Sequence, residues 1–138
     1  MAGFRVPLVV RSYELDTLGH VNHAVYHQYA EVARMSAFTA AGCDWDALVD
    51  WRVSAVLLST TVNFRSELRA GEHIEVTCAF KFGTGKTFNL DSMILKADGT
   101  VAAEVYCITG LMDLDVRKLL PEPRAALEAH GFDVDKLA

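Results

Sequence analysis

Residues 24–41 read AVYHQYAEVARMSAFTAA, and this stretch determines the architecture that we expect for the chain. The apolar residues that recur at every fourth position are Val25, Tyr29, Ala33, Ala37 and Ala41, with Val32, Ser36 and Ala40 beside them. This spacing predicts one amphipathic helix of 18 residues, about 27 Å long. Asn22 can cap the start of the helix, and Gly42 suits the left-handed position just after its end.

The apolar face of this helix consists mostly of alanine, serine and tyrosine rather than leucine. Small side chains let a neighbouring layer approach the helix axis closely, because the side chains at a contact set the distance between packed elements. We therefore expect a curved sheet that wraps tightly around one central helix.

Strand-like segments lie on both sides of the helix in the sequence. One precedes it at 6–13. The four that follow it are 55–64, 73–82, 86–97 and 100–112. The turn residues between these four are Gly71, 83–85 and Asp98-Gly99. Such short links predict an antiparallel meander of four strands, and a short helix at 123–130 completes an α+β order of elements.

The composition is that of an ordinary globular domain of 138 residues, of which 51% are apolar and 22% charged. No linker or repeat divides the sequence, so we expect one domain over 1–138. The net charge of −5 and the lack of a basic run argue against a nucleic-acid partner. No apolar segment suits a membrane span or a signal peptide, so we expect no membrane contact and a cytoplasmic location.

The densest group of polar residues lies just before the helix, where residues 13–23 read YELDTLGHVNH. Backbone N–H groups at a helix start are unpaired and carry partial positive charge, so they can hold an oxygen that becomes an oxyanion. Asp16 lies close enough to His23 in the sequence to act at the same place as a base or a nucleophile. A structural interpretation stays open, in which Asp16 starts a turn, Gly19 supplies a positive φ angle and Asn22 caps the helix.

Two parts of the chain resemble one known family. The first comprises Asp16, Gly19, His20, Val21 and Asn22, followed on the helix by Tyr26, Tyr29, Glu31 and Arg34. The second is the segment 64–72, which reads FRSELRAGE. Together they resemble the hotdog-fold acyl thioesterases of the 4-hydroxybenzoyl-CoA thioesterase type, over residues 6–120. The resemblance implies an α+β hotdog fold, with one long central helix wrapped by a five-stranded, mostly antiparallel sheet.

The resemblance also implies an activity, the hydrolysis of an acyl-CoA or acyl-carrier-protein thioester to a free acid and a thiol. Asp16 matches the family's catalytic carboxylate, and Asn22 and His23 complete the catalytic group, with the His23 N–H polarising the thioester carbonyl. Asp16 then either activates water or attacks the carbonyl directly, and the sequence leaves both routes open. His23 stands where the family usually has a second asparagine, so its imidazole is a further acid or base if it faces the thioester.

The resemblance further implies how the substrate is held. The motif residues that we expect to line the thioester site are Gly19, His20, Val21 and Tyr26. Coenzyme A or phosphopantetheine enters as part of the substrate, with no further cofactor, and Arg65 and Lys86 can meet its phosphate groups. The family forms dimers with each active site between two subunits, so we expect a homodimer or a dimer of dimers.

Two patterns allow other interpretations of the polar residues. Glu31 is an alternative catalytic carboxylate, but its spacing also suits a pair with Arg34 at i+3 or with His27 at i−4, and we favour this structural role. His20, His23 and His27 include an i, i+4 pair that can hold a metal. No metalloenzyme signature accompanies these histidines, so we expect no metal site.

Two other functions could use the same residues. A hotdog hydratase or dehydratase would share the acyl thioester substrate, but such relatives carry an Asp-x-Asn-Pro-x-His pattern. Here Thr17, Leu18 and Gly19 follow Asp16 instead. A non-catalytic acyl-binding module would keep the fold without turnover, and the intact Asp16 and Gly19 argue against it.

Overall fold

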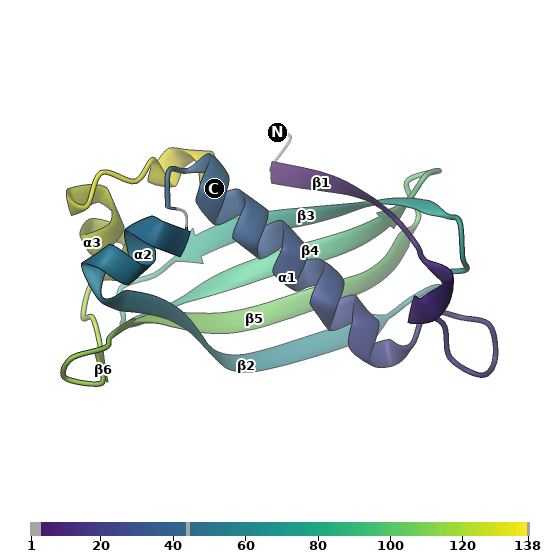
Figure 1. Ribbon diagram of the computed structural model, residues 1–138, viewed down its shortest axis with the longest axis horizontal. Coiled ribbons are helices and arrows are strands. Elements are labelled where there is room, and N and C mark those ends of the chain that lie inside the picture. Colours follow the sequence, from purple (N-terminus) through teal and green to yellow (C-terminus); the bar gives the residue numbers. More distant parts are fainter. Residues whose placement is uncertain (1–3, 44, 138) are drawn as a thin grey trace.

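The structure, a computed structural model, describes residues 4–43 and 45–137. One long helix lies across one face of a curled sheet (Figure 1). The strands are β1 Phe4–Val9, β2 Val53–Phe64, β3 His73–Phe82, β4 Thr87–Lys96, β5 Val101–Asp113 and β6 Lys118–Leu119. The helices are α1 His23–Ala40, α2 Trp45–Trp51 and α3 Pro123–Ala129, with short 3-10 turns at η1 Ser12–Glu14 and η2 Val134–Leu137.

The sheet has the strand order β1-β3-β4-β5-β2, and the two-residue β6 adds to β5. Every pairing is antiparallel. The turns predicted at 83–85 and at Asp98-Gly99 form hairpins between β3 and β4 and between β4 and β5. The α+β class and the hotdog arrangement of a central helix against an antiparallel sheet are confirmed.

The predicted meander of four strands is wrong at its first turn. Among the described strands, β2 pairs with β5 and not with β3, and Phe64 lies opposite Ala103 at the far edge of the sheet. The segment 65–72 crosses from that edge to the other, where Gly71 N donates to the carbonyl of Val10 at 2.8 Å. Turn residues indicate where a strand ends, but they do not determine which strand pairs with it.

Helix α1 begins after Asn22, as predicted, and buries a face of mostly small residues. Its buried residues are Tyr26, Tyr29, Ala30, Ala33, Ala37 and Phe38. Ala33 and Ala37 are fully buried, which lets the sheet approach the helix closely. The predicted face was partly wrong, since Val32 is 41% exposed and Ala40 is exposed. A strict four-residue recurrence drifts by about 40° per step around a helix of 3.6 residues per turn.

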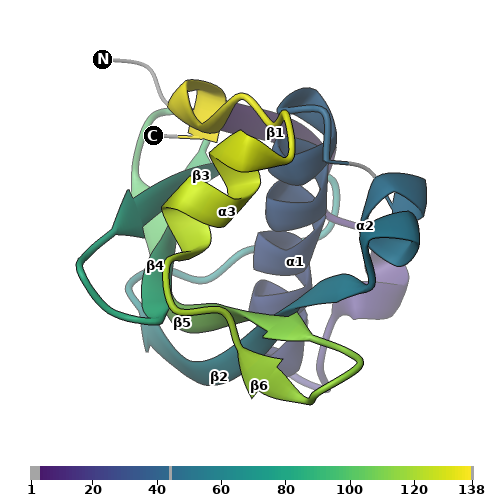
Figure 2. The same cartoon turned by 90° about the vertical axis from the view of Figure 1, so that its left-hand side faces the viewer.

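A helix at one end of the sheet was not predicted. No helix was expected between α1 and the strand at 55–64, but Trp45–Trp51 forms α2. Seven residues are too few for helical periodicity to stand out. The predicted terminal helix forms α3, and α2, α3 and η2 gather at the same end of the molecule (Figure 2). The loop before α1 lies at the opposite end (Figure 1).

The first strand also differs from its prediction. It covers Phe4–Val9 rather than 6–13, because the chain turns into η1 at Ser12. Within the described residues, no helix is long and apolar enough to cross a membrane.

Candidate active site

The loop between η1 and α1 is closed by its own backbone. Asp16 N donates to the carbonyl of His20 at 2.7 Å, and Leu15 pairs with Val21 as an isolated bridge. Gly19 has a φ of +81°, a left-handed conformation that other residues adopt at a cost. Gly19 thus has the structural role that was considered for it, and it lets the chain turn back toward the helix within a few residues.

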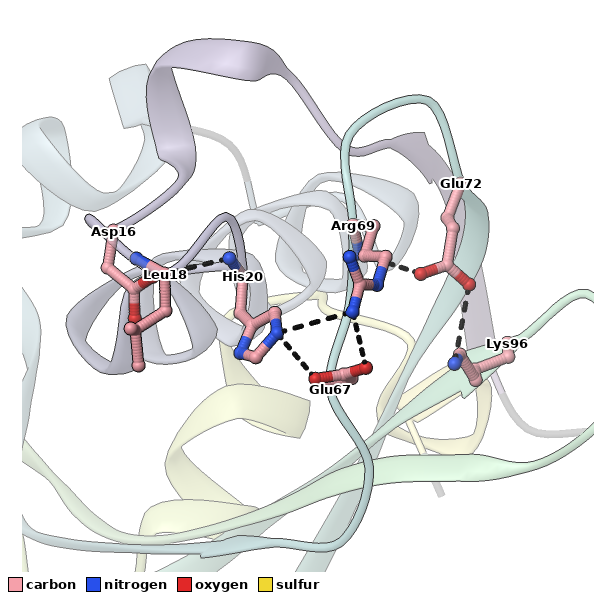
Figure 3. A network of polar contacts seen from close by, with 7 residues as sticks. All are labelled: Asp16, Leu18, His20, Glu67, Arg69, Glu72 and Lys96. Atoms are coloured by element: carbon pink, nitrogen blue, oxygen red, sulfur yellow. Dashed lines mark hydrogen bonds and ion pairs between the residues drawn. The ribbon is translucent and has the colours of Figure 1, made fainter.

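The carboxylate of Asp16 is oriented by two backbone donors. Its Oδ1 accepts hydrogen bonds from Leu18 N at 2.8 Å and from His20 N at 3.2 Å (Figure 3). Within the described residues, no hydrogen bond reaches Oδ2, and the side chain is half-buried. One carboxylate oxygen therefore fixes the side chain, and the other remains available to a reacting group.

The start of α1 lies next to this carboxylate. Asn22 Oδ1 accepts from Ala24 N at 3.0 Å, and the Asn22 carbonyl accepts from Val25 N at 2.9 Å. The side chain of Asn22 is thereby a helix cap. The N–H of His23, the first residue of the helix, makes no hydrogen bond within the described part of the chain. It remains a free donor at the positive end of the helix.

These groups border a cavity of about 360 Å³. The loop and α1 contribute Asp16, His20, Val21, His23 and Tyr26. The segment after β2 contributes Arg65 and Glu67, and Phe64 packs edge-on against Tyr26 with ring centroids 5.1 Å apart. The structure thus brings together five of the site residues predicted from the loop and the helix start. Burial raises the pKa of the Tyr26 hydroxyl, so this wall of the cavity stays uncharged.

A buried hydrogen bond anchors the loop to the helix. Tyr29 Oη donates to Glu14 Oε1 at 2.7 Å, and Arg11 N donates to the same oxygen at 2.8 Å. The carbonyl of Glu14 accepts from Asn22 N at 2.9 Å. No role was expected for Glu14 from the sequence. An acidic residue just before a turn usually lies on the surface, so only the fold shows that Glu14 is buried.

A network of charged side chains contacts the imidazole of His20. His20 Nε2 lies 2.6 Å from Glu67 Oε2, and Arg69 Nη2 lies 3.0 Å from Glu67 Oε1 (Figure 3). The hydrogen bond from Arg69 lowers the pKa of Glu67, so Glu67 stays ionised. Glu72 extends the network by accepting from Arg69 N and pairing with Lys96. Sequence reasoning missed Glu67, because its contact to His20 crosses more than forty residues of sequence.

The sequence model of the Thioesterase-like superfamily matches residues 10–130, which is most of the chain. The chain belongs to this superfamily. The match covers the Asp16 loop, α1 and the whole of β2 to β5.

Two curated relatives and one solved structure are similar to this thioesterase-family domain. The chain is 31% identical to acyl-acyl carrier protein thioesterase ATL3, chloroplastic, of Arabidopsis thaliana over 94% of its own length and 56% of that protein's. It is 26% identical to long-chain acyl-CoA thioesterase FadM of Escherichia coli over 80% of its own length and 84% of that protein's. The 1,4-dihydroxy-2-naphthoyl-CoA thioesterase Slr0204 of Synechocystis superposes with a TM-score of 0.82 at 19% identity, over 96% and 97% of the two chains.

Four predicted site residues of this thioesterase-family domain do not line the Asp16 cavity: Gly19 and Asn22, which belong to its loop, and Glu31 and Lys86, which lie elsewhere. Glu31 lies further along α1, where it pairs with Arg34 at 3.5 Å, as we favoured. Lys86 lies in the hairpin between β3 and β4, at the other end of the sheet. The residues just before Lys86 in this hairpin border α3. Within the described residues, no three His, Cys, Asp or Glu side chains group as a metal site. Arg65 does lie at the cavity, where Glu104 Oε1 holds its guanidinium at 2.8 Å.

Replacing Tyr29 by Phe tests the anchor of the Asp16 loop. Tyr29→Phe leaves a buried carboxylate with one donor fewer, so we expect a loss of about 1–3 kcal/mol in the free energy of unfolding at neutral pH. Burial and the Glu14 hydrogen bond raise the pKa of Tyr29 above its ordinary 10, so the folded state holds this proton more tightly. Above pH 10 the unfolded wild type loses this proton and the folded state keeps it, so the free energy of unfolding of the wild type falls as pH rises. The difference in stability between the wild type and Tyr29→Phe therefore shrinks above pH 10.

Urea unfolding at several pH values measures this difference. Tyr106→Phe is the matched control, because Tyr106 Oη also donates to a glutamate but lies on the surface. We expect this control to change stability by less than about 0.5 kcal/mol. Equal losses in the two variants would show that the Tyr29 contact anchors nothing.

Proposed function

We propose that the Asp16 cavity hydrolyses an acyl thioester to a free acid and a thiol, with Asp16 as the catalytic carboxylate. One observation carries the proposal: Asp16 and His23 line the same cavity, and in the described part of the chain neither Asp16 Oδ2 nor the His23 N–H has a hydrogen bond. A base or nucleophile next to an oxyanion donor is the arrangement that acyl transfer to water requires. Membership of the Thioesterase-like superfamily supports the same reaction.

The His23 N–H would donate to the thioester carbonyl oxygen. Negative charge grows on this oxygen as the carbonyl carbon becomes tetrahedral, and the positive end of α1 stabilises it. The carbon–sulfur bond then breaks, the carbonyl re-forms, and the thiolate leaves and takes up a proton. The imidazole of His23 is exposed at the cavity, so it is placed to donate that proton.

Asp16 can act by two routes in this geometry. In the first, Oδ2 accepts a proton from water, whose oxygen bonds to the carbonyl carbon. In the second, Oδ2 itself bonds to that carbon, and water then hydrolyses the mixed anhydride. Both routes require that Leu18 N and His20 N hold Oδ1, because these bonds fix the orientation of the carboxylate.

The thiol of the substrate is coenzyme A or a carrier protein's phosphopantetheine. The names of the Arabidopsis and Escherichia coli relatives support one carrier each. Arg65 at the cavity and Arg69 near it are both exposed cations that can meet a phosphate. Both also pair with a glutamate, so a phosphate would compete with Glu104 or Glu67 for them. The cytoplasmic location expected from the sequence stays a prediction.

A homodimer through β2 is the assembly that the sheet favours. β2 is a twelve-residue edge strand, and an unpaired edge of this length is a template for another strand. Its side chains include Leu57 and Leu58, which are 40% and 50% exposed. A two-fold axis through the middle of β2 would place the Phe64 end of one strand beside the Val53 end of the other. The Asp16 cavity at Phe64 would then lie next to the second subunit.

Replacing Asp16 by Asn tests the proposed reaction. Asparagine keeps the shape of the side chain and an oxygen for the two backbone donors, but it is neither a base nor a nucleophile. We expect kcat to fall by roughly 10²–10⁴-fold, with the fold intact. The measurement is the release of free thiol from a panel of aliphatic and aromatic acyl-CoA and acyl-carrier-protein thioesters.

Asp98→Asn is the matched control for this assay. Asp98 also accepts a backbone hydrogen bond in a turn, from Thr100 N at 2.9 Å, and it does not border the cavity. It should retain wild-type turnover. Full turnover of the Asp16→Asn protein would contradict the proposal, and loss of turnover in Glu31→Gln alone would transfer the catalytic role to Glu31.

Replacing Leu58 by Lys tests the proposed dimer. A lysine on an edge strand discourages strand pairing, and Leu58 is exposed enough to change without disturbing the core. We expect sedimentation velocity to give at least two chains per particle for the wild type and one for Leu58→Lys. Val116→Lys, on the exposed turn between β5 and β6, should leave the mass unchanged. A monomeric wild type at micromolar concentration would rule the dimer out.

A further inference from the structure

The proposed reaction does not use the imidazole of His20, although His20 lines the Asp16 cavity. The His20 side chain is 30% exposed, and its Nε2 lies 2.6 Å from Glu67 Oε2. A carboxylate that orients an imidazole beside a nucleophile recurs in hydrolases of unrelated folds. The pair of His20 and Glu67 has this form, so we ask what the ring can do in the cavity.

Arg69 determines the charge of Glu67 in this pair. Arg69 Nη2 donates to Glu67 Oε1 at 3.0 Å, so each oxygen of the carboxylate has its own partner. This hydrogen bond lowers the pKa of Glu67, which therefore accepts a proton from its partners and does not donate one. Arg69 Nη2 also lies 3.5 Å from His20 Nε2, but the contact of Nε2 with Glu67 is much shorter. The proton of a neutral His20 ring is thus on Nε2, and the lone pair is on Nδ1.

Nδ1 of His20 has no partner within the described residues. Figure 3 shows this nitrogen on the edge of the ring that is turned away from Glu67 and Arg69. His23 lines the same cavity, but no hydrogen bond orients its imidazole in the described part of the chain. Of these two rings, that of His20 is therefore the one that is oriented to accept a proton.

The contact with Glu67 is not needed to hold the Asp16 loop. Val21 N donates to the carbonyl of Leu68 at 2.9 Å, which fixes the loop against the segment that carries Glu67. Asp16 N donates to the carbonyl of His20 at 2.7 Å, which closes the loop itself. A partly exposed ion pair adds little to stability. What the contact does determine is the direction of the His20 ring.

We propose that His20, positioned by Glu67, is the base that activates water in the second half of the reaction. This inference rests on the proposed function and selects its second route. In that route Asp16 Oδ2 bonds to the acyl carbon, the thiol leaves, and a mixed anhydride forms. Water then attacks this anhydride, and a base within hydrogen-bond reach of the water accelerates the attack.

The step is balanced without a further reactant. The water oxygen bonds to the acyl carbon while one of its protons passes to His20 Nδ1. The bond from this carbon to Asp16 Oδ2 breaks, so the free acid leaves and Asp16 is again a carboxylate. Glu67 stabilises the imidazolium that has formed, and His20 then returns its proton to solvent.

Replacing His20 by Ala tests the inference with the acyl-CoA of the panel that the wild type hydrolyses fastest. Acylation of Asp16 does not need this base, but hydrolysis of the anhydride does. We expect kcat to fall by roughly 10²-fold and kcat/KM to stay within about twofold of the wild type, because kcat/KM reports acylation. Rapid mixing should give a burst of about one thiol per chain, and the intact mass should show a bound acyl group. A merely structural role of His20 would instead lower kcat/KM.

Added imidazole distinguishes a missing base from a distorted loop. It should raise kcat of His20→Ala by about tenfold, after subtraction of the rate that Asp16→Asn shows in the same buffer. Glu67→Gln keeps the ring but removes the charge that orients it and stabilises its imidazolium. Its kcat should fall by roughly tenfold, with the same burst and without rescue by imidazole.

The matched control variants lie outside the cavity. His73→Ala removes an exposed histidine of β3, and Glu75→Gln removes the charge of a glutamate that pairs with Arg5 on the surface. Both should keep the wild-type kcat. An unchanged kcat in His20→Ala, or a loss without a burst and without an acyl adduct, would overturn this inference and leave hydrolysis at Asp16 standing. If the wild type released thiol from no thioester, the proposed function would fail, and this inference with it.

Discussion

The buried hydrogen bond from Tyr29 to Glu14 is the contact on which the geometry of the site depends. It joins the segment before the Asp16 loop to the second turn of α1, so the loop and the free N–H groups of the helix keep one relative position. The helix is fixed in turn because Ala33 and Ala37 let the sheet close on it. A carboxylate and an oxyanion donor can then face one cavity without either being held by the substrate.

Local patterns predicted much of the fold and the centre of the site. The α1 helix, its Asn22 cap and the hairpin at Asp98-Gly99 depend on residues close in sequence, and these predictions are confirmed. Partners far apart were not accessible in this way. The pairing of β2 with β5 and the contact of His20 with Glu67 depend on tertiary packing, which a single sequence does not encode by spacing. Glu14 was missed for the same reason.

One helix serves two chemically different cavities in this fold. Its first turn, with the N–H of His23, borders the cavity in which Asp16 lies. Its later turns, with Arg34 and Phe38, border a second cavity. The first cavity suits a carbonyl that gains negative charge, because free donors lie at the helix start.

A crystal structure with a bound acyl-CoA analogue, in which a methylene group replaces the thioester sulfur, tests the central claim most directly. The resulting ketone cannot be hydrolysed at that bond. The account predicts that the ketone oxygen lies about 2.7–3.1 Å from His23 N, with Asp16 Oδ2 beside the ketone carbon. A ketone bound away from the start of α1, or an Asp16 carboxylate turned away from it, would contradict the account.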